Sequence, residues 1–158
     1  MSTVSGNQYG VGLITLLVAA SISIGYYQMY WLPEQLATPD IDEHVLHPVK
    51  STHIEMILGS SNADQQDNYV PKLVNLQLSI DNHVIWTNGD ETAHTVTPDH
   101  RYTDGYSGDF GSTGVVKPGE IYDFLFTEAP PNIPVTIEYH CEPHPWMTGK
   151  IVVSQARF

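Results

Sequence analysis

The sequence predicts an all-β sandwich domain preceded by one membrane-spanning helix. Residues 11–32 form an uncharged, largely apolar run that is long enough to cross a bilayer as a helix. From residue 52 onward, apolar and polar side chains alternate in several short segments, which is the period of half-buried strands. Turn-forming residues separate these segments, and short strands with regular turns are typical of β-sandwiches.

The apolar run, VGLITLLVAASISIGYYQMYWL, ends in an aromatic cluster of the kind found at membrane interfaces. Pro33 follows and is expected to stop the helix. A cleaved signal peptide is the competing interpretation, but it would have a basic segment before a shorter apolar run. No Lys or Arg precedes this run. We therefore expect residues 1–10 to be a tail and residues 11–32 to be an uncleaved anchor.

The charge of the chain is strongly acidic, with 18 Asp and Glu against 6 Lys and Arg, and the first charged residue is Glu34. Nucleic acid is excluded as a partner, because phosphate binding needs basic patches. An acidic surface suits protein partners with basic docking patches. Neither flank of the apolar run is basic, so the positive-inside rule does not retain the acidic part in the cytoplasm. We therefore expect the C-terminal domain on the extracytoplasmic face of the cell membrane.

Residues 33–51 are rich in Pro and acidic residues and are interpreted as a linker or a loosely packed strap, whose His44 and His47 are expected to be solvated. The sandwich is expected over residues 52–158. Residues 98–114 are rich in Gly, Asp and Tyr and are expected to form a long loop. The segments with strand character are 53–58, 73–80, 83–88, 94–97, 120–126, 135–139 and 149–154.

The segment EYHCEPHPWMTGK carries the candidate chemistry, and its Cys141 is the only cysteine of the chain. A single cysteine forms no internal disulfide, so it is a buried apolar residue, a reactive thiol or a metal ligand. In a strand, Cys141 points to the same face as Tyr139, and His140 points to the opposite face. A turn stiffened by two prolines then brings His144 and Met147 back toward the sulfur.

A thiolate, an imidazole and a thioether form a soft ligand set that suits copper, and a second histidine, His94, is available from the segment TNGDETAHTVT. Zinc has little use for Met, and a thiolate-bridged binuclear copper centre needs a second cysteine. A nucleophilic Cys–His pair needs an oxyanion hole, for which no group can be identified. A metal-free structural cysteine remains the alternative to copper.

The block YHCEPHPWMTGKIVV resembles the copper-binding loop of the cupredoxins, the small blue copper proteins, and its C-x-x-H-x-x-M spacing resembles the amicyanin type most closely. The upstream block VIWTNGDETAHTVT, with its W-x-N-x-D-x-x-x-H pattern, resembles the strand that leads to the family's first histidine ligand. The resemblance covers about residues 52–154. It implies a Greek-key sandwich holding one type 1 copper ion, with ligands His94, Cys141, His144 and, axially, Met147.

The resemblance also implies roles for residues around the ligands. Asn88, Thr95 and Pro143 would support the ligands; many relatives have Asn at the position of Thr95, so the side-chain latch on the ligand loop is in doubt. In the family the C-terminal histidine ligand, which corresponds to His144 here, carries electrons out through an apolar surface patch. Pro145 and Trp146 are available for this patch, unless Trp146 packs inward. His83, His100 and His140 are expected to be surface histidines, of which His100 lies nearest to His94 in the loop sequence.

The function implied is a membrane-anchored electron carrier, not an enzyme, that passes single electrons between redox proteins outside the membrane. Three alternatives stay open. An unfilled copper position could react with a small molecule such as a nitrogen oxide. The chain could be an accessory subunit of a membrane oxidase. A role in copper delivery is the third, although delivery sites tend to be exposed and rich in Met and His.

Overall fold

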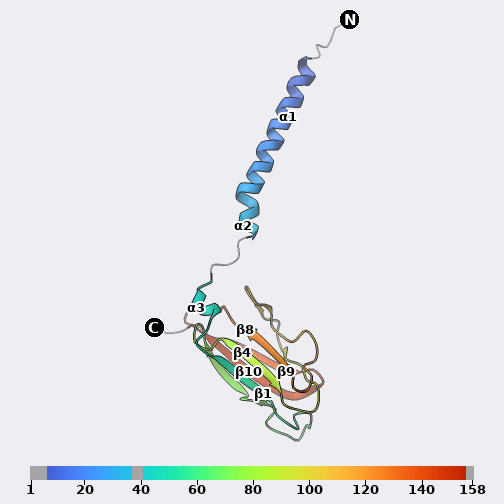
Figure 1. Cartoon of the computed structure of the whole chain (residues 1–158), viewed down its shortest axis with the longest axis vertical. Helices are drawn as coiled ribbons and strands as arrows, with labels where there is room; N and C mark the ends of the chain where they lie inside the picture. Colours follow the sequence, from blue (N-terminus) through green and yellow to red (C-terminus); the bar gives the residue numbers. More distant parts are fainter. Residues whose placement is uncertain (1–6, 37–40, 156–158) are drawn as a thin grey trace. The chain divides into compact units, whose positions relative to one another are not determined.

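The computed structural model describes residues 7–36 and 41–155. The chain divides into two compact units, residues 1–38 and residues 39–158. The first unit is the N-terminal helix, and the second is a β-sandwich (Figure 1).

The N-terminal helix is continuous from Asn7 to Leu36. It consists of α1 (Asn7–Tyr26), a π-helical turn η1 (Tyr27–Trp31) and α2 (Leu32–Leu36). The prediction that Pro33 ends the helix is therefore wrong. A proline ring inside an α-helix clashes with the carbonyl four residues earlier, and the wider π turn directly before it relieves such crowding.

This helix has the length and composition of a membrane span. Its window from Gly10 to Glu34 has a mean hydropathy of 1.7, and none of it is buried within the protein. The hydroxyls of Thr15, Ser21 and Ser23 donate to helix carbonyls four residues earlier, so their polar atoms are satisfied without water. These properties are also those of a signal sequence near an N-terminus.

The second unit contains two four-stranded sheets and a small hairpin. One sheet has the order β2-β1-β4-β8, and the other has the order β3-β10-β9-β5. Pairs β1–β4 and β3–β10 are parallel, whereas the remaining pairs are antiparallel. The strand bounds are β1 Ser51–Met56, β2 Tyr69–Val70, β3 Leu73–Gln77, β4 His83–Asn88, β5 Thr97–Pro98, β6 Thr103–Asp104, β7 Gly108–Asp109, β8 Ile121–Leu125, β9 Val135–Cys141 and β10 His144–Ser154.

The alternation seen in the sequence appears as alternating burial along the strands. In β4, Val84, Trp86 and Asn88 are buried and their neighbours are partly exposed. Trp86 lies in the centre of the core, with its ring 5.8 Å from that of Tyr139. The sandwich predicted from period two is thus confirmed, but some of its strands differ from the expected ones. In place of a strand at residues 94–97 there are an isolated bridge between His94 and Val116 and the two-residue β5. The strand expected at residues 73–80 ends at Gln77, β2 was not expected, and β10 begins before residue 149.

Two segments without predicted structure are attached to the sandwich. In the expected linker, the short helix α3 (Glu43–Leu46) is capped by Asp42, and Asn82 donates to the carbonyl of Val45 at 2.9 Å. His44 and His47 are exposed, as expected for solvated residues. The 98–114 loop contains the hairpin β6–β7 and inserts Phe110 into the core.

The ends of β4 and β9 position the candidate site. After Asn88, the chain makes a loop that returns through His94, whose backbone exchanges two hydrogen bonds with Val116. A tight turn supports this end of the sheet: Gly119, with a φ of +78°, donates its N–H to the Asn88 carbonyl at 2.8 Å. The site therefore rests on the rigid end of the sandwich.

Candidate metal centre

Three potential ligand atoms from distant parts of the chain converge in one place. The Sγ of Cys141 lies 3.6 Å from Nδ1 of His94 and 3.5 Å from Nδ1 of His144. The two Nδ1 atoms are 3.1 Å apart. Among the described residues, these are the only three His, Cys, Asp or Glu side chains grouped closely enough to hold a metal ion.

Cys141 and His144 are placed by the hairpin between β9 and β10. Ile137, Tyr139 and Cys141 are buried on the inner face of β9, as the alternation predicts, while His140 lies on the outer face. His144 pairs with Cys141, and the register of the two strands shifts between His144 and Thr148. This irregularity brings the histidine ring back over the sulfur.

Asp90 fixes His94, and sequence reasoning assigned it no role although it stands in the W-x-N-x-D-x-x-x-H pattern. Its Oδ2 lies 2.9 Å from Nε2 of the fully buried His94 ring. Burial alone would raise the pKa of Asp90, but hydrogen bonds from Gly59, His94 and other donors hold it at about 2. The carboxylate thus keeps the proton of His94 on Nε2 and leaves the Nδ1 lone pair free for a metal.

Asn88 holds the loop that carries His94. Its Nδ2 donates to the carbonyls of Thr92 and Val116, both at 2.8 Å, and its Oδ1 accepts the N–H of Asp90 at 2.9 Å. Asn88 thus contacts the loop that leads to His94, which is the ligand it was expected to support. Every polar atom of its buried amide is used.

Thr95 supports the cysteine and the residue after it with two polar groups. Its backbone N–H donates to Cys141 Sγ at 3.3 Å, and its Oγ1 accepts the N–H of Glu142 at 2.9 Å. The Thr95 hydroxyl thus connects residue 95 to the ligand loop through the N–H of Glu142. Burial would raise the pKa of Cys141, but hydrogen bonds from His94 and Thr95 outweigh it and lower the pKa of the thiol.

His144 lies at the surface end of the site. Its ring is 5.4 Å from that of Trp146, which is 38% exposed and donates its indole N–H to the Ser60 carbonyl at 3.2 Å. Trp146 therefore does not pack inward as core. Pro143 and Pro145 are also exposed, so an apolar patch borders the His144 ring. Burial and the nearby His94 lower the pKa of His144, which favours the neutral, metal-binding form.

Met147 is fully buried and belongs to the same core cluster as Cys141. The group of His94, Cys141 and His144 is called the metal group here, and the other histidines named from the sequence lie apart from it. His83 contacts Ser51 and Asp123, and His140 pairs with Asp99 at 2.5 Å. His100 is exposed.

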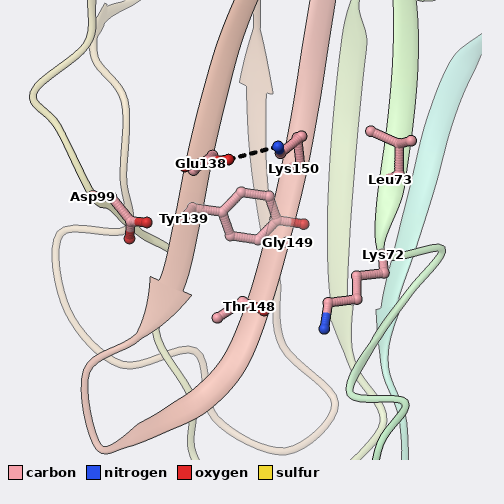
Figure 2. Close-up of a pocket in the computed structure, with 8 residues that line it drawn as sticks. All are labelled: Lys72, Leu73, Asp99, Glu138, Tyr139, Thr148, Gly149 and Lys150. Carbon is pink, nitrogen blue, oxygen red and sulfur yellow. Dashed lines mark ion pairs between the residues drawn. The ribbon is translucent and has the colours of Figure 1, made fainter.

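A separate groove lies on β9 and β10, with a volume of about 480 Å³ (Figure 2). Lys150 and Glu138 form a 2.6 Å ion pair across it, and the Tyr139 ring lies against Gly149. None of the metal-binding atoms lines this groove.

The donor set fits a copper ion. It combines one thiolate with two imidazole nitrogens. The nearby carboxylate of Asp90 is hydrogen-bonded to Nε2 of His94. The two Nδ1 atoms lie 3.1 Å apart, and both can face one ion when each ring carries its proton on Nε2. Soft thiolate and imidazole ligands are typical of copper, and a full set of zinc ligands is missing from the group.

No family model matches the chain. Among curated proteins, amicyanin of Paracoccus denitrificans is 34% identical over 79 residues, which are 49% of this chain and 53% of that protein. The chain thus matches about half the length of this relative.

Among solved structures, a purple cupredoxin from Nitrosopumilus maritimus aligns with a TM-score of 0.50 and 23% identity, over 65% of this chain and 99% of the other. Amicyanin from Paracoccus versutus aligns with a TM-score of 0.44 and 23% identity, over 68% and 84% of the two chains. The chain thus has a cupredoxin-like β-sandwich fold and a donor set that fits one copper ion, and about half of it is similar in sequence to amicyanin.

Proposed function

We propose that this protein is a membrane-anchored electron carrier that binds one type 1 copper ion through His94, Cys141, His144 and Met147. When bound, copper supplies one-electron chemistry by alternating between Cu(I) and Cu(II). The observation that carries the proposal is the convergence of Cys141 Sγ and two Nδ1 atoms within 3.6 Å of one another.

The protein part of this function is to hold the ligands still and keep water away. His94 is held by Asp90, and Cys141 by Thr95, so two ligands have fixed orientations before a metal arrives. His94, Cys141 and Met147 are fully buried. A ligand set that is already in place needs little rearrangement when the charge of the metal changes, and this suits rapid electron transfer.

His144 is the proposed exit for electrons, since it is the one member of the donor group that is not fully buried. The patch of Pro143, Pro145 and Trp146 beside it would contact a redox partner. Glu142 is exposed next to this patch, and the chain carries a net charge of −12. We therefore infer a partner protein with basic residues around its docking surface, which would steer association at low salt.

The helix from Asn7 to Leu36 is the proposed anchor, with the sandwich on the extracytoplasmic side. Its uncharged span and aromatic end support retention in the membrane, where the carrier would stay close to membrane-bound redox complexes.

The test is to add Cu(II) to the full chain in detergent and to record the visible spectrum before and after a reductant. An intense thiolate-to-copper band that bleaches reversibly is expected, and Cys141→Ser should abolish it. Azide or nitrite should leave the band unchanged if all copper positions are filled by the protein. A weak or absent band in the wild type would refute the carrier function, and a band moved by azide or nitrite would favour a reactive, open site.

A further inference from the structure

Tyr69 is linked to the metal group through a single residue, Thr95. The Thr95 N–H donates to Cys141 Sγ at 3.3 Å, and the carbonyl of the same residue accepts the Tyr69 hydroxyl at 2.6 Å. The N–H and the carbonyl lie on either side of one Cα. Holding the carbonyl therefore limits the backbone rotation that would turn the N–H away from the sulfur.

The remaining polar atom of Thr95 is also used. Its Oγ1 accepts the Glu142 N–H at 2.9 Å and contacts Thr97 Oγ1 at 3.0 Å. Each polar group of this buried residue thus has a partner, and the bond from Tyr69 is the only one given to its carbonyl within the described part of the chain. Loss of that bond would leave a buried carbonyl without a donor.

Tyr69 itself has little freedom to move. It lies in the two-residue strand β2, which pairs with the end of β1, and it is 1% exposed. Its ring meets that of Tyr139 edge to face at 5.0 Å. Burial raises the pKa of Tyr69, so its hydroxyl remains a neutral donor. A rigid, buried donor with one short hydrogen bond defines the position of its acceptor.

We propose that Tyr69 is a positioning residue that holds the Thr95 N–H on the Cys141 thiolate and thereby raises the reduction potential of the bound copper. This inference rests on the proposed function. An N–H donated to the sulfur draws electron density away from it, which weakens its donation to the metal and favours Cu(I) over Cu(II). Hydrogen bonds to the cysteine sulfur are among the features that tune such sites.

The test compares Tyr69→Phe with Tyr139→Phe in the copper-loaded full chain. Both changes remove one hydroxyl from a fully buried ring, but the Tyr139 hydroxyl accepts the indole N–H of Trp86 at 3.2 Å and has no contact with Thr95. Tyr69→Phe should change the Cu(II)/Cu(I) equilibrium about fivefold, as expected for roughly one net hydrogen bond. That is a lowering of the potential by about 40 mV, at 59 mV per tenfold for one electron.

Two further readouts address the contact directly. Tyr69→Phe should shift the thiolate-to-copper band, and in the copper-free chain it should speed hydrogen exchange of the Thr95 amide. Tyr139→Phe should do neither. If Tyr69→Phe does not fold, a fluorinated tyrosine placed at position 69 strengthens the donor and should raise the potential instead.

The outcomes separate this inference from the proposed function. A wild-type chain without the thiolate-to-copper band would overturn both. A normal wild-type band, with the same potential and the same Thr95 exchange in Tyr69→Phe and Tyr139→Phe, would overturn the role of Tyr69 alone.

Discussion

Replacing Asp90 with Asn should destabilise the copper-free fold and weaken copper binding together. The carboxylate is 3% exposed and accepts four hydrogen bonds. Oδ1 accepts from Gly59 and Glu91, and Oδ2 accepts from Ser61 and His94. An amide keeps one acceptor oxygen, so its NH₂ group would face two N–H donors at the position of the other oxygen.

The expected cost follows from these contacts. Two N–H donors that lose their acceptor cost about 1–3 kcal/mol each, and relaxation and partial solvation of the loop reduce the sum to about 2–4 kcal/mol. The pKa of Asp90 gives a similar figure: a carboxyl whose pKa falls from 3.8 to about 2 contributes roughly 2.5 kcal/mol at neutral pH. Because the carboxylate that orients His94 becomes a neutral amide, copper affinity should fall roughly 10- to 100-fold.

The assay is urea unfolding of the copper-free chain, followed by copper titration against a competing chelator. Asp123→Asn is the matched control, because Asp123 also lies 2.9 Å from a histidine nitrogen but is 58% exposed and far from the metal group in the fold. Its cost should stay below about 1 kcal/mol, with unchanged copper binding. The reasoning is refuted if Asp90→Asn behaves like this control.

The same prediction has a pH dependence. The pKa of Asp90 is lower in the folded chain than in the unfolded chain, so its contribution is complete above the unfolded value near 3.8 and disappears as the pH falls through about 2. The stability difference between wild type and Asp90→Asn should therefore be constant near neutral pH and shrink below about pH 4. If the stability difference persists unchanged to pH 2, the ionised carboxylate of Asp90 is not its source.

Three other changes test separate parts of the structure. Gly149→Ala would place a Cβ inside the Tyr139 ring and should cost about 1–3 kcal/mol in urea unfolding, whereas Gly114→Ala, with open space around it, should cost little. Thr95→Val removes the acceptor for the N–H of the ligand loop and should cost about 1–3 kcal/mol, while Thr95→Ser keeps that acceptor and should restore most of it. Trp146→Ala should slow electron transfer to a partner with little change in the visible spectrum; an unchanged transfer rate would show that the partner docks elsewhere.

The alternation of apolar residues was sufficient to predict the sandwich and the faces of its strands. It predicts Cys141 on the inner face and His140 on the outer face, as found in β9, because side chains in a strand alternate strictly. The same reasoning was less successful at Pro33, where local rules predict a helix end and a π turn carries the helix onward. It also predicted a strand at residues 94–97, where a single bridge and a two-residue strand are found.

The role of Asp90 and of Tyr69 was not visible in the sequence. Asp90 is one of many acidic residues, and only the fold shows that its carboxylate is buried against His94 and the loop of Gly59. Tyr69 is one of nine tyrosines and stands 26 positions before the carbonyl that it binds. No local pattern distinguishes such residues, because their partners come from other strands.

The sequence by itself determined the chemistry of the site: one thiolate, a histidine and a methionine at short spacing, and a distant histidine to complete the set. Ligand identity is a property of side chains, so spacing and composition are enough to indicate copper. The tertiary structure decided which atoms bind, how each is held and which side chain reaches the surface. Those features depend on contacts between distant segments, such as His94 with His144, 50 residues apart, and Ser60 with Trp146, 86 residues apart, and these form only when the two sheets pack together.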